Sequence, residues 1–307
     1  MKILVTGGAG FIGSHLVEEL LSNENEILIF DNCLTGKKEN LEMTGNFKFI
    51  IDDFGSENSL EEIEKFDPDV CFHLAAQSSV VVSVENPALD FEHNILQPIK
   101  LIQVLLKSNC KKFVFTSSGG TIFGEPSVIP TAEEDYADEP ESPYGVAKKR
   151  LNELIKIMTN NSNLKYSILN LSNVYGPRQD PHGEAGVVSI FANKYLNNEE
   201  PIIYGDGEQT RDYVYVKDVV SALIKASKID KNHFLNIGTG VETSVNNLAN
   251  SMKRQFNSEI NPIYKPAREG ELNRSVLNNT KAKKELDWKP EYNLDEGMKQ
   301  VFNWLKA

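Results

Sequence analysis

Residues 3–13 read ILVTGGAGFIG, which is an apolar run, a glycine-rich turn and the start of a helical pattern. Glycine at positions 7, 10 and 13 lets backbone N–H groups approach a pyrophosphate closely, and a helix N-terminus supplies partial positive charge to that anion. The spacing Gly-x-x-Gly-x-x-Gly is one residue longer in its first gap than the usual dinucleotide fingerprint. The stretch therefore predicts a dinucleotide site at Gly7, Gly10 and Gly13.

An acidic residue after the second apolar run supports this interpretation. Asp31 follows Gly13 by 18 residues, where a carboxylate binds the ribose hydroxyls of adenosine. Because a carboxylate there repels a 2′-phosphate, we expect NAD rather than NADP. We also expect Asn32 to contact the cofactor, and Asp53 and Phe54 to meet the adenine, although ordinary turns are the alternative at both places.

Short apolar runs alternate with longer helical stretches through the first 171 residues. This alternation predicts a parallel sheet with helices on both faces. Amphipathic helices are expected at residues 11–21 and 147–158, where apolar residues recur at helical spacing. Strands are expected at residues 3–5, 27–30, 47–51, 70–72, 113–115 and 166–171.

The pattern becomes irregular beyond residue 171, with Gly176-Pro177 and a glycine-rich turn at residues 205–207. This change predicts a second, smaller lobe. The expected fold is a Rossmann-type, doubly wound α/β sheet with a smaller C-terminal substrate-binding lobe. We expect the NAD-binding domain at residues 1–172, with 209–240 returning to it, the lobe at 173–208 and 241–307, and a closing helix at 294–305.

Composition excludes several classes of partner. The 307-residue chain has a net charge of -12, which argues against a nucleic-acid surface. It contains no apolar run of the roughly 20 residues that span a bilayer, and its start is too short for a signal peptide. Cys33, Cys71 and Cys110 lack metal-ligand spacing, which favours reduced thiols. We therefore expect a cytoplasmic protein without a metal, a nucleic-acid partner or a membrane partner.

A tyrosine and a lysine carry the candidate chemistry. Tyr144 and Lys148 lie four residues apart, on one face of an expected helix. A nearby ammonium stabilises a phenolate and is expected to lower the tyrosine pKa from about 10, giving a base suited to alcohol oxidation. In isolation, an exposed pair is the common alternative. Residues 116–121, TSSGGT, add hydroxyls at the carboxyl edge of the expected sheet, where doubly wound folds bind ligands.

Together these segments resemble the extended short-chain dehydrogenase/reductase family, and within it the UDP-glucose 4-epimerase branch. The resemblance implies bound NAD, a UDP-sugar substrate and a homodimer built from helices such as residues 87–107 and 144–158. The matching segments are HLAAQ at 73–77, Asn94, Ser117-Ser118, Tyr144 with Lys148, NVYGPR at 173–178, GDG at 205–207, TRDY at 210–213 and REGE at 268–271. The cofactor contacts it implies, besides those already named, come from Phe11, Ile12, Leu74, Ala75, Ala76, Asn94, Ser117, Tyr144 and Lys148.

The resemblance also implies a mechanism. Tyr144, helped by Ser118, takes the proton of the sugar 4-hydroxyl while hydride passes to the nicotinamide, and the transient 4-keto sugar then receives the hydride on its other face. Counted back from residues 123–124, the catalytic hydroxyl of the family falls on Gly119. Because glycine has no side-chain donor, the role passes to Ser118 or to Thr121, and we favour Ser118.

The substrate end is expected to hold two phosphate charges with arginines. By resemblance, Arg211 and Arg268 hold the diphosphate, and Asn173 contacts the diphosphate or the sugar. Ser275 stands where a tyrosine in some members restricts the N-acetyl pocket, so we expect UDP-N-acetylhexosamines beside UDP-glucose and UDP-galactose. A further substrate contact is expected from Glu271. A uracil pocket is expected from Val188, Ile203 and Tyr204, although these three residues could equally belong to the core.

Other activities of the family stay open to different degrees. A 4,6-dehydratase needs an Asp-Glu pair after its catalytic threonine, and a UDP-glucuronate decarboxylase usually has a glutamate at the position of Thr121. Gly120 and Thr121 supply no carboxylate. A UDP-glucuronate 4-epimerase, with Arg178 beside the substrate carboxylate, or another NAD-dependent nucleotide-sugar enzyme is the alternative. A non-catalytic NAD-binding regulatory protein is disfavoured because Tyr144 and Lys148 are both present.

Overall fold

The computed structural model describes residues 1–135, 139–181, 186–268 and 272–306. The chain forms two compact units. Unit 1 comprises Met1–Ser118, Ser142–Asn170 and Val220–Leu235, and unit 2 comprises Gly119–Glu141, Leu171–Val219 and Asn236–Ala307. From the sequence, NAD is expected in one domain and the nucleotide sugar in the other, and those domain boundaries stay a prediction.

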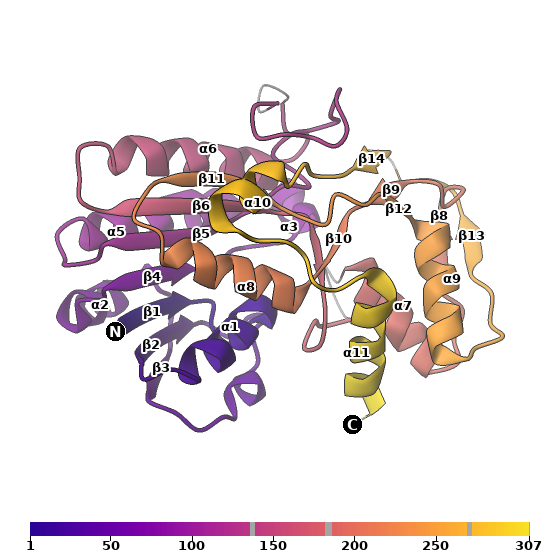
Figure 1. The fold of residues 1–307 in the computed structure, drawn as a ribbon, viewed down its shortest axis with the longest axis horizontal. Coiled ribbons are helices and arrows are strands. Elements are labelled where there is room, and N and C mark those ends of the chain that lie inside the picture. The colour runs from indigo at the N-terminus through magenta and orange to yellow at the C-terminus, as the bar shows by residue number, and fades with distance from the viewer. Residues whose placement is uncertain (136–138, 182–185, 269–271, 307) are drawn as a thin grey trace. The chain divides into compact units, whose positions relative to one another are not determined.

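Unit 1 is built on a seven-stranded sheet with the order β11-β6-β5-β4-β1-β2-β3 (Figure 1). The strand pairs from β3 to β5 run parallel. The order of the strands reverses between β1 and β4, and such a reversal is where doubly wound folds bind ligands. The strands are β1(Lys2–Thr6), β2(Glu26–Asp31), β3(Phe47–Ile51), β4(Val70–His73), β5(Lys112–Ser118), β6(Lys165–Leu171) and β11(His233–Ile237).

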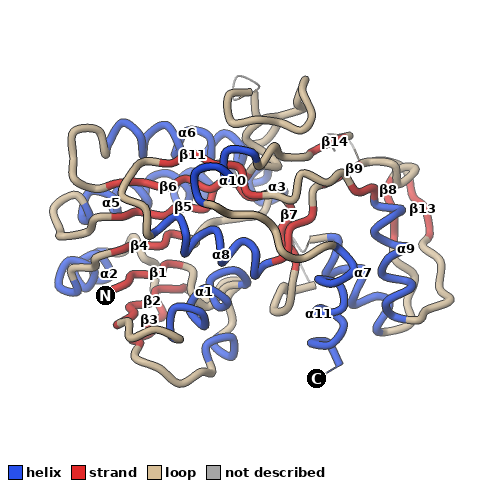
Figure 2. The backbone as a smooth tube through the Cα atoms, in the orientation of Figure 1, coloured by secondary structure: helices blue, strands red, loops and turns tan. Residues whose placement is uncertain are grey.

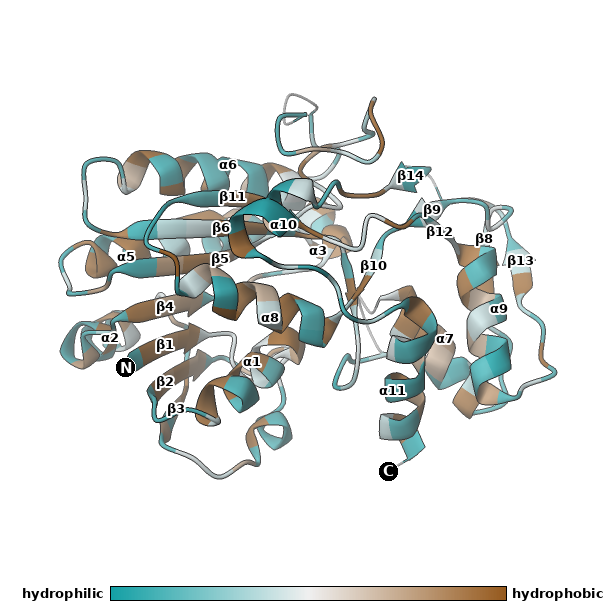
Figure 3. Cartoon of the chain, in the orientation of Figure 1, coloured by the Kyte–Doolittle hydropathy of each residue, from teal (hydrophilic) through white to brown (hydrophobic). Residues whose placement is uncertain are grey.

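Helices cover the sheet, and its central strands β1, β4 and β5 are buried along almost their whole length. One face packs against α2, α5 and α6 in a core that includes Leu4, Phe113, Leu101 and Leu151. Helix α1 lies on the other face, and Figure 3 shows hydrophobic colour along β1 and β4. Each fully buried Leu or Phe contributes about 1.5–3 kcal/mol, so this core dominates the stability of unit 1. The doubly wound fold predicted from the sequence is confirmed.

The helices of unit 1 differ from the expectation at two places. The stretch 87–107, expected as one helix, is divided by the π-helical turn η2. Helix α6 begins at Pro143 rather than at Ala147, because the Ser142 hydroxyl caps it by accepting from the Gly145 N–H at 3.1 Å. The helices are α1(Phe11–Leu21), η1(Lys38–Leu41), α2(Glu57–Phe66), α3(Val80–Glu85), α4(Pro87–Phe91), η2(Glu92–Leu96), α5(Gln97–Leu105) and α6(Pro143–Met158).

Unit 2 consists of short strands and helices joined by long loops (Figure 2). Its sheets are β12-β9-β14, β10-β7 and β13-β8, and helices α7, α9 and α11 pack together. Its strands are β7(Asn173–Tyr175), β8(Ile202–Tyr204), β9(Thr210–Arg211), β10(Tyr213–Tyr215), β12(Thr243–Ser244), β13(Ile263–Lys265) and β14(Arg274–Ser275). Its helices are α7(Val187–Leu196), α9(Val245–Phe256), α10(Thr280–Leu286) and α11(Leu294–Lys306), and α8(Val216–Ser227) begins in it.

The end of the chain is fixed to unit 2 by buried polar contacts. The Trp288 indole is 1% exposed and donates to the Asp218 carbonyl at 2.9 Å. The Asp218 carboxylate in turn accepts from the N–H groups of Glu291 and Tyr292. The closing helix expected at residues 294–305 follows as α11. Within the described ranges, every helix is too short or too polar to cross a bilayer.

Candidate active site

The glycine turn lies where the strand order reverses. Gly7 has a φ of 75°, and a Cβ on it would lie 2.6 Å from the Ala75 nitrogen, so the backbone after β1 touches the backbone after β4. The Leu74 and Ala75 N–H groups both donate to the Thr6 carbonyl at 3.0 Å. A Cβ on Gly13 would lie 2.0 Å from the Gly7 carbonyl oxygen. Only glycine therefore permits this close packing of turn, strand and helix.

The N-terminus of α1 suits an anion. Gly10 caps the helix without a side-chain hydrogen bond, and the first turn contains no acidic residue. A Cβ on Gly10 would meet only the Gly7 carbonyl, at 3.2 Å, so the space beside it is open. Unsatisfied N–H groups at a helix start, including those of Phe11 and Ile12, favour a phosphate. The arrangement fits a pyrophosphate.

Asp31 lies next to the glycine turn. Its carboxylate accepts from the Ala9 N–H at 3.0 Å and from the Cys33 N–H at 2.9 Å, and the residue is 9% exposed. Burial raises the pKa of Asp31, although the backbone hydrogen bonds oppose that effect. Asn32 is exposed and accepts from the Leu34 N–H at 3.1 Å, as in an ordinary turn. Only the carboxylate of Asp31 is therefore held beside the turn.

The residues expected around adenine have different surroundings. Asp53 lies 3.5 Å from the His93 Nδ1, and its carboxylate accepts from the Gly55 N–H at 3.1 Å. Phe54 is 6% exposed and meets His73 edge-on, with ring centroids 4.8 Å apart. Phe54 thus belongs to the core, because its ring fills space between the sheet and α2. Asp53 alone of the two presents a polar group near the surface.

Residues after β4 and β5 contribute further groups to unit 1. Leu74, Ala75 and Ala76 are partly exposed. Asn94 is 2% exposed and donates to the Gln77 carbonyl at 2.8 Å. The Ser117 hydroxyl is buried without a hydrogen-bond partner in the described residues. A buried polar group of this kind generally has a partner, which indicates a ligand beside Ser117.

Ser118, Tyr144 and Lys148 come together within unit 1. A side-chain hydrogen bond joins Ser118 at the end of β5 to Tyr144 in the first turn of α6. Lys148 follows one turn later, with its Nζ 5.8 Å from the centre of the Tyr144 ring and 4.7 Å from that of Phe115. The lysine donates to the Thr116 carbonyl at 3.2 Å. The expected triad is thus formed by two neighbouring elements of one unit.

The pKa values of this pair follow burial. The pKa of Tyr144 is raised to about 12, chiefly by burial and also by the charge of Asp90, while the hydrogen bond from Ser118 opposes the rise. The pKa of Lys148 is lowered to about 8, again chiefly by burial. The lowered tyrosine pKa expected from the spacing alone is therefore wrong for the chain by itself, because loss of solvation outweighs the lysine.

The positions after Ser118 explain the glycine at 119. A Cβ on Gly119 would lie 2.5 Å from the Leu277 side chain, and its N–H donates to the Leu171 carbonyl at 2.8 Å. A side chain at this position would require the buried Leu277 side chain to move. The Thr121 hydroxyl is buried without a hydrogen-bond partner in the described part of the chain. Of the two hydroxyls considered from the sequence, Ser118 is the one bonded to Tyr144.

A carboxylate that the sequence interpretation missed lies near this pair. Asp90 on α4 is fully buried, and its Oδ1 accepts from the Gln77 amide at 2.7 Å and from the Asn94 amide at 2.9 Å. Its charge raises the pKa values of both Tyr144 and Lys148. The sequence held one signal, since Asp90 lies one helical turn before Asn94, which the resemblance singles out.

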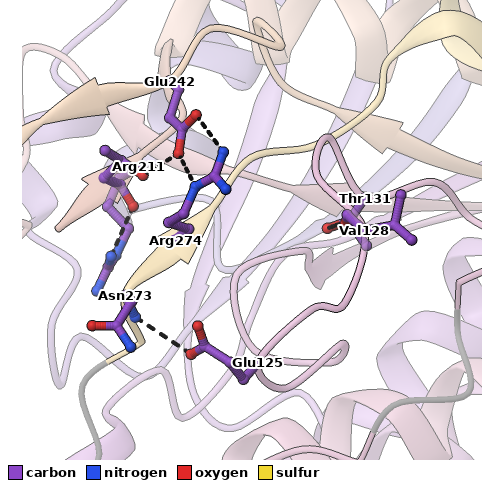
Figure 4. A network of polar contacts seen from close by, with 8 residues as sticks. Glu125, Val128, Thr131, Arg211, Glu242, Asn273 and Arg274 are labelled. Carbon is purple, nitrogen blue, oxygen red and sulfur yellow. Dashed lines mark hydrogen bonds and ion pairs between the residues drawn. The ribbon is translucent and has the colours of Figure 1, made fainter.

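In unit 2, Arg211 belongs to a network around the sheet β12-β9-β14 (Figure 4). Its guanidinium donates to the Thr210 carbonyl at 2.8 Å. Two bonds of 2.5 and 2.8 Å join Arg274 to Glu242, which also accepts from the Thr210 hydroxyl at 2.6 Å. These bonds lower the pKa of Glu242 to about 2. Glu242 thereby joins Arg274 of β14 to Thr210 of β9, the strand that also carries Arg211.

A buried carboxylate, that of Asp212, accepts hydrogen bonds from two segments next to these strands. Asp212 is fully buried and accepts from the Thr239 N–H at 2.8 Å, the Thr239 hydroxyl at 2.6 Å and the Gly240 N–H at 3.1 Å. It also accepts from the Leu277 N–H at 3.4 Å. Asp212 therefore joins β9, the loop after β11 and the segment after β14.

Arg268, the second expected phosphate ligand, is exposed and lies over the ring of Tyr204, 3.9 Å from its centre. A hydrogen bond from Arg268 lowers the pKa of Tyr204. Tyr204 is partly exposed, whereas Val188 and Ile203 are 2% and 1% exposed and belong to the core. Glu271, the remaining expected contact, lies outside the described residues.

Three residues far apart in the sequence surround one space in unit 2. A Cβ placed on Gly120 would lie 4.0 Å from both the Asn173 Oδ1 and the Ser275 Oγ. Nothing nearer faces Gly120, so the space is open and lined by an amide and a hydroxyl. Ser275 itself is 8% exposed. This space has the polarity that a sugar hydroxyl or an amide requires.

Metal chemistry receives no support from the side chains. Within the part of the chain that the structure describes, there is no group of three or more His, Cys, Asp or Glu that could hold a metal ion. His73 lies between aromatic rings, and a 2.6 Å hydrogen bond joins it to the Thr6 hydroxyl. Burial lowers the pKa of His73 to about 3, so it is neutral.

The chain is similar to known proteins over almost its whole length. Residues 4–301 match the family described as GDP-mannose 4,6 dehydratase. A relative from Methanocaldococcus jannaschii, named putative UDP-glucose 4-epimerase, is 47% identical over 304 residues, covering 99% of this chain and 98% of its own.

Two solved structures share the whole fold. The UDP-glucose 4-epimerase of Thermotoga maritima, solved with UDP-glucose, has a TM-score of 0.96 at 44% identity and covers 100% of this chain and 99% of its own. That of Thermus thermophilus, solved with NAD, has a TM-score of 0.92 at 38% identity, with the same coverage. The chain therefore belongs to this family of extended short-chain dehydrogenases/reductases, in the branch that contains the UDP-glucose 4-epimerases.

Proposed function

We propose that this protein is an isomerase that inverts C4 of a UDP-hexose, interconverting UDP-glucose and UDP-galactose with tightly bound NAD. The observation that carries the proposal is the hydrogen bond between Ser118 and Tyr144, with Lys148 one turn away in the same helix. A phenol, a hydroxyl and an ammonium in this arrangement suit the oxidation of an alcohol. The UDP-glucose 4-epimerase of T. maritima, solved with UDP-glucose, and the M. jannaschii protein named putative UDP-glucose 4-epimerase support the choice of substrate.

The residues of unit 1 fit NAD. The open helix start at Gly10 suits the pyrophosphate, and the anchored carboxylate of Asp31 suits the ribose hydroxyls. The unpartnered hydroxyl of Ser117 supplies a further polar contact. Bound there, NAD would supply the hydride acceptor and donor that oxidation and reduction at C4 require. We therefore assign the cofactor to unit 1 and the nucleotide of the substrate to unit 2.

The side chains of the chain itself move and hold the proton. Tyr144 takes the proton of the sugar 4-hydroxyl and returns it after inversion, and Ser118 orients the phenol for both transfers. Lys148, as an ammonium, stabilises the phenolate that forms on Tyr144. Gly120 and Thr121 offer no carboxylate to act at C5 or C6. The sugar is therefore inverted rather than dehydrated or decarboxylated.

Replacement of each candidate hydroxyl tests its assignment. We expect Ser118→Ala to lower kcat by about 100-fold, because the phenol loses its hydrogen-bond partner. Thr121→Val, which is nearly isosteric, should change kcat by less than about threefold, since Ser118 and not Thr121 is hydrogen-bonded to Tyr144 among the described residues. Steady-state kinetics with UDP-galactose measures both. The reverse order of effects would assign the role to Thr121.

The diphosphate is assigned to Arg211 and Arg268, because bidentate arginines suit phosphates and both lie in unit 2. Asn173 is assigned to the diphosphate or the sugar. Tyr204 is partly exposed and remains the best candidate to contact the uracil. Val188 and Ile203 are buried and belong to the core of unit 2.

The open space at Gly120 favours UDP-N-acetylhexosamines as additional substrates. We expect Ser275→Tyr to lower kcat/KM for UDP-N-acetylglucosamine by about 100-fold while changing that for UDP-glucose by less than about fivefold, because the phenol fills volume that the acetyl group needs. The ratio of the two kcat/KM values is the measurement. Ser275→Thr is the matched control and should keep the wild-type ratio. An unchanged ratio in the tyrosine variant contradicts the proposal.

The oligomeric state and the cellular location complete the proposal. We infer a homodimer, because Val81 and Val84 on α3 are 53% and 63% exposed and Leu89 on α4 is 40% exposed. Helices α3 and α4 pack together, and exposed apolar side chains on neighbouring helices mark protein–protein contacts. Sedimentation equilibrium gives the mass in solution. We also infer a cytoplasmic location, since Cys33, Cys71 and Cys110 are all free thiols.

A panel of UDP-sugars assayed by NMR for inversion at C4 tests the function as a whole. UDP-galactose should be converted to UDP-glucose until the two reach equilibrium. UDP-glucuronate, with Arg178 as the proposed partner of its carboxylate, is the second candidate substrate, and UDP-N-acetylglucosamine is the third. Absence of inversion in all of them, in protein that carries NAD, would refute the proposed activity and favour a regulatory NAD-binding role.

A further inference from the structure

A buried cation lies in unit 1. Lys148 is 3% exposed, and its ammonium donates to the Thr116 carbonyl and lies against the Phe115 ring. Removing an ammonium from water costs several kcal/mol unless an opposite charge compensates it. Burial accordingly lowers the pKa of Lys148 to about 8, and Asp90 is the charge that opposes the fall.

A buried anion lies on the neighbouring helix. Helix α4 packs against α6, which carries Lys148, and Asp90 on α4 is 0% exposed. The amides of Gln77 and Asn94 hold its Oδ1 at 2.7 and 2.9 Å. Its Oδ2 is buried without a hydrogen-bond partner among the described residues. A carboxylate so poorly hydrogen-bonded needs a nearby positive charge to stay ionised.

The other charged groups around Asp90 are engaged elsewhere or lie toward solvent. The charges that act on Asp90 are those of Lys148 and His93. The His93 Nδ1 on η2 lies 3.5 Å from the Asp53 carboxylate, so this ring is engaged by another acidic residue. Glu85 on α3 is exposed and Glu92 on η2 is partly exposed.

On α6, the charged side chains near Lys148 have other partners, so Asp90 is its counter-charge. Arg150 pairs with Glu153 at 2.9 Å, and Lys156 lies 4.0 Å from the centre of the Phe234 ring. Lys149 is buried and has partners of its own. The charge that acts on Lys148 is that of Asp90.

We propose that Asp90 is the counter-charge of the buried Lys148, held in place by Gln77 and Asn94, and that it positions the lysine to act on Tyr144. Asp90 touches neither the phenol nor a substrate group and is a positioning residue. Its anion keeps the lysine protonated at neutral pH, and Gln77 and Asn94 fix the direction from which that charge acts. Of the two tests below, the pH dependence of turnover rests on the proposed function, whereas the thermal cycle does not.

A thermal double-mutant cycle tests the pairing without activity. The proteins are wild type, Asp90→Asn, Lys148→Met and the double variant, each with saturating NAD at pH 7. Alone, Asp90→Asn should lower Tm by roughly 5–10 °C, because a buried ammonium loses its counter-charge. In the Lys148→Met background it should raise Tm, since it removes an uncompensated carboxylate. Glu64→Gln, an exposed carboxylate in the same unit, is the control and should leave Tm unchanged. Equal shifts in both backgrounds overturn the proposal.

The pH dependence of turnover is the second readout. Without the anion, Lys148 loses its proton at lower pH, so the alkaline limb of kcat should move down by about one pH unit. At pH 8, kcat for UDP-galactose should fall about fivefold, because the protonated fraction of Lys148 falls by that factor, while KM changes by less than about twofold. An equal loss of kcat at every pH would point to general damage and overturn the proposal. If no UDP-sugar is epimerised at all, the proposed function fails, and the thermal cycle still decides the role of Asp90.

Discussion

Tyr144→Phe should lower kcat for the conversion of UDP-galactose by about 1,000-fold or more, because it removes the one hydroxyl proposed to carry the substrate proton. The phenylalanine ring keeps the packing against Lys148, whose Nζ lies 5.8 Å from the ring centre. Bound NAD, measured by absorbance after denaturation, should stay at the wild-type amount. Stopped assays with NMR detection of C4 inversion measure the loss.

A second tyrosine in the same unit provides the control. Tyr166 on β6 is partly buried, and burial raises its pKa, as it does that of Tyr144. Tyr166→Phe should leave kcat within about twofold of wild type, since no part of the proposed chemistry involves it. If Tyr144→Phe keeps more than a tenth of the wild-type kcat with every UDP-sugar, the proposed base is wrong.

Gly13→Ala should abolish NAD binding and lower Tm by roughly 5–10 °C. This fall in Tm should be larger than that caused by Gly10→Ala. The added Cβ would lie 2.0 Å from the Gly7 carbonyl oxygen and 2.8 Å from the Gly8 Cα. Both contacts are with backbone atoms, so the turn itself has to move. Calorimetry of NAD binding to the stripped protein and thermal denaturation give the two measurements.

Gly10→Ala separates cofactor contact from packing. Its Cβ would meet only the Gly7 carbonyl, at 3.2 Å, and would otherwise enter the open space beside the helix start. We expect Tm to change by less than about 3 °C, whereas NAD binding weakens by at least about tenfold because the methyl group stands where the pyrophosphate approaches. Wild-type NAD affinity in Gly10→Ala would mean that the cofactor binds away from this turn.

The sequence predicts the doubly wound sheet well because its signal is local. Each strand of the first 171 residues contains an apolar run, and the glycines at 7 and 13 fill positions where the backbone admits no Cβ. Strand β11 was missed, since its residues 233–237 mix polar and apolar types in a part of the chain whose pattern is irregular. Local patterns carry no information on which distant strand an edge strand joins.

The electrostatics of the site could not be predicted in the same way. The spacing of Tyr144 and Lys148 indicates their proximity and not the degree of their burial, and burial decides the direction in which the tyrosine pKa moves. Asp90 was missed because its partners Gln77 and Lys148 lie 13 and 58 positions away in the chain. Only the packing of α4 on α6 reveals their relation.

The π-helical turn η2 has a consequence for the helical phase of this region. A π turn adds one residue to a helix, and one residue corresponds to a rotation of about 100°. The core-facing side of α5, with Leu101 and Leu105, is thereby offset from the side of α4 that carries Asp90. Deleting one residue within Glu92–Leu96 would rotate α4 by about 100° relative to α5, so the extra residue of this single turn sets the direction in which the Asp90 carboxylate points.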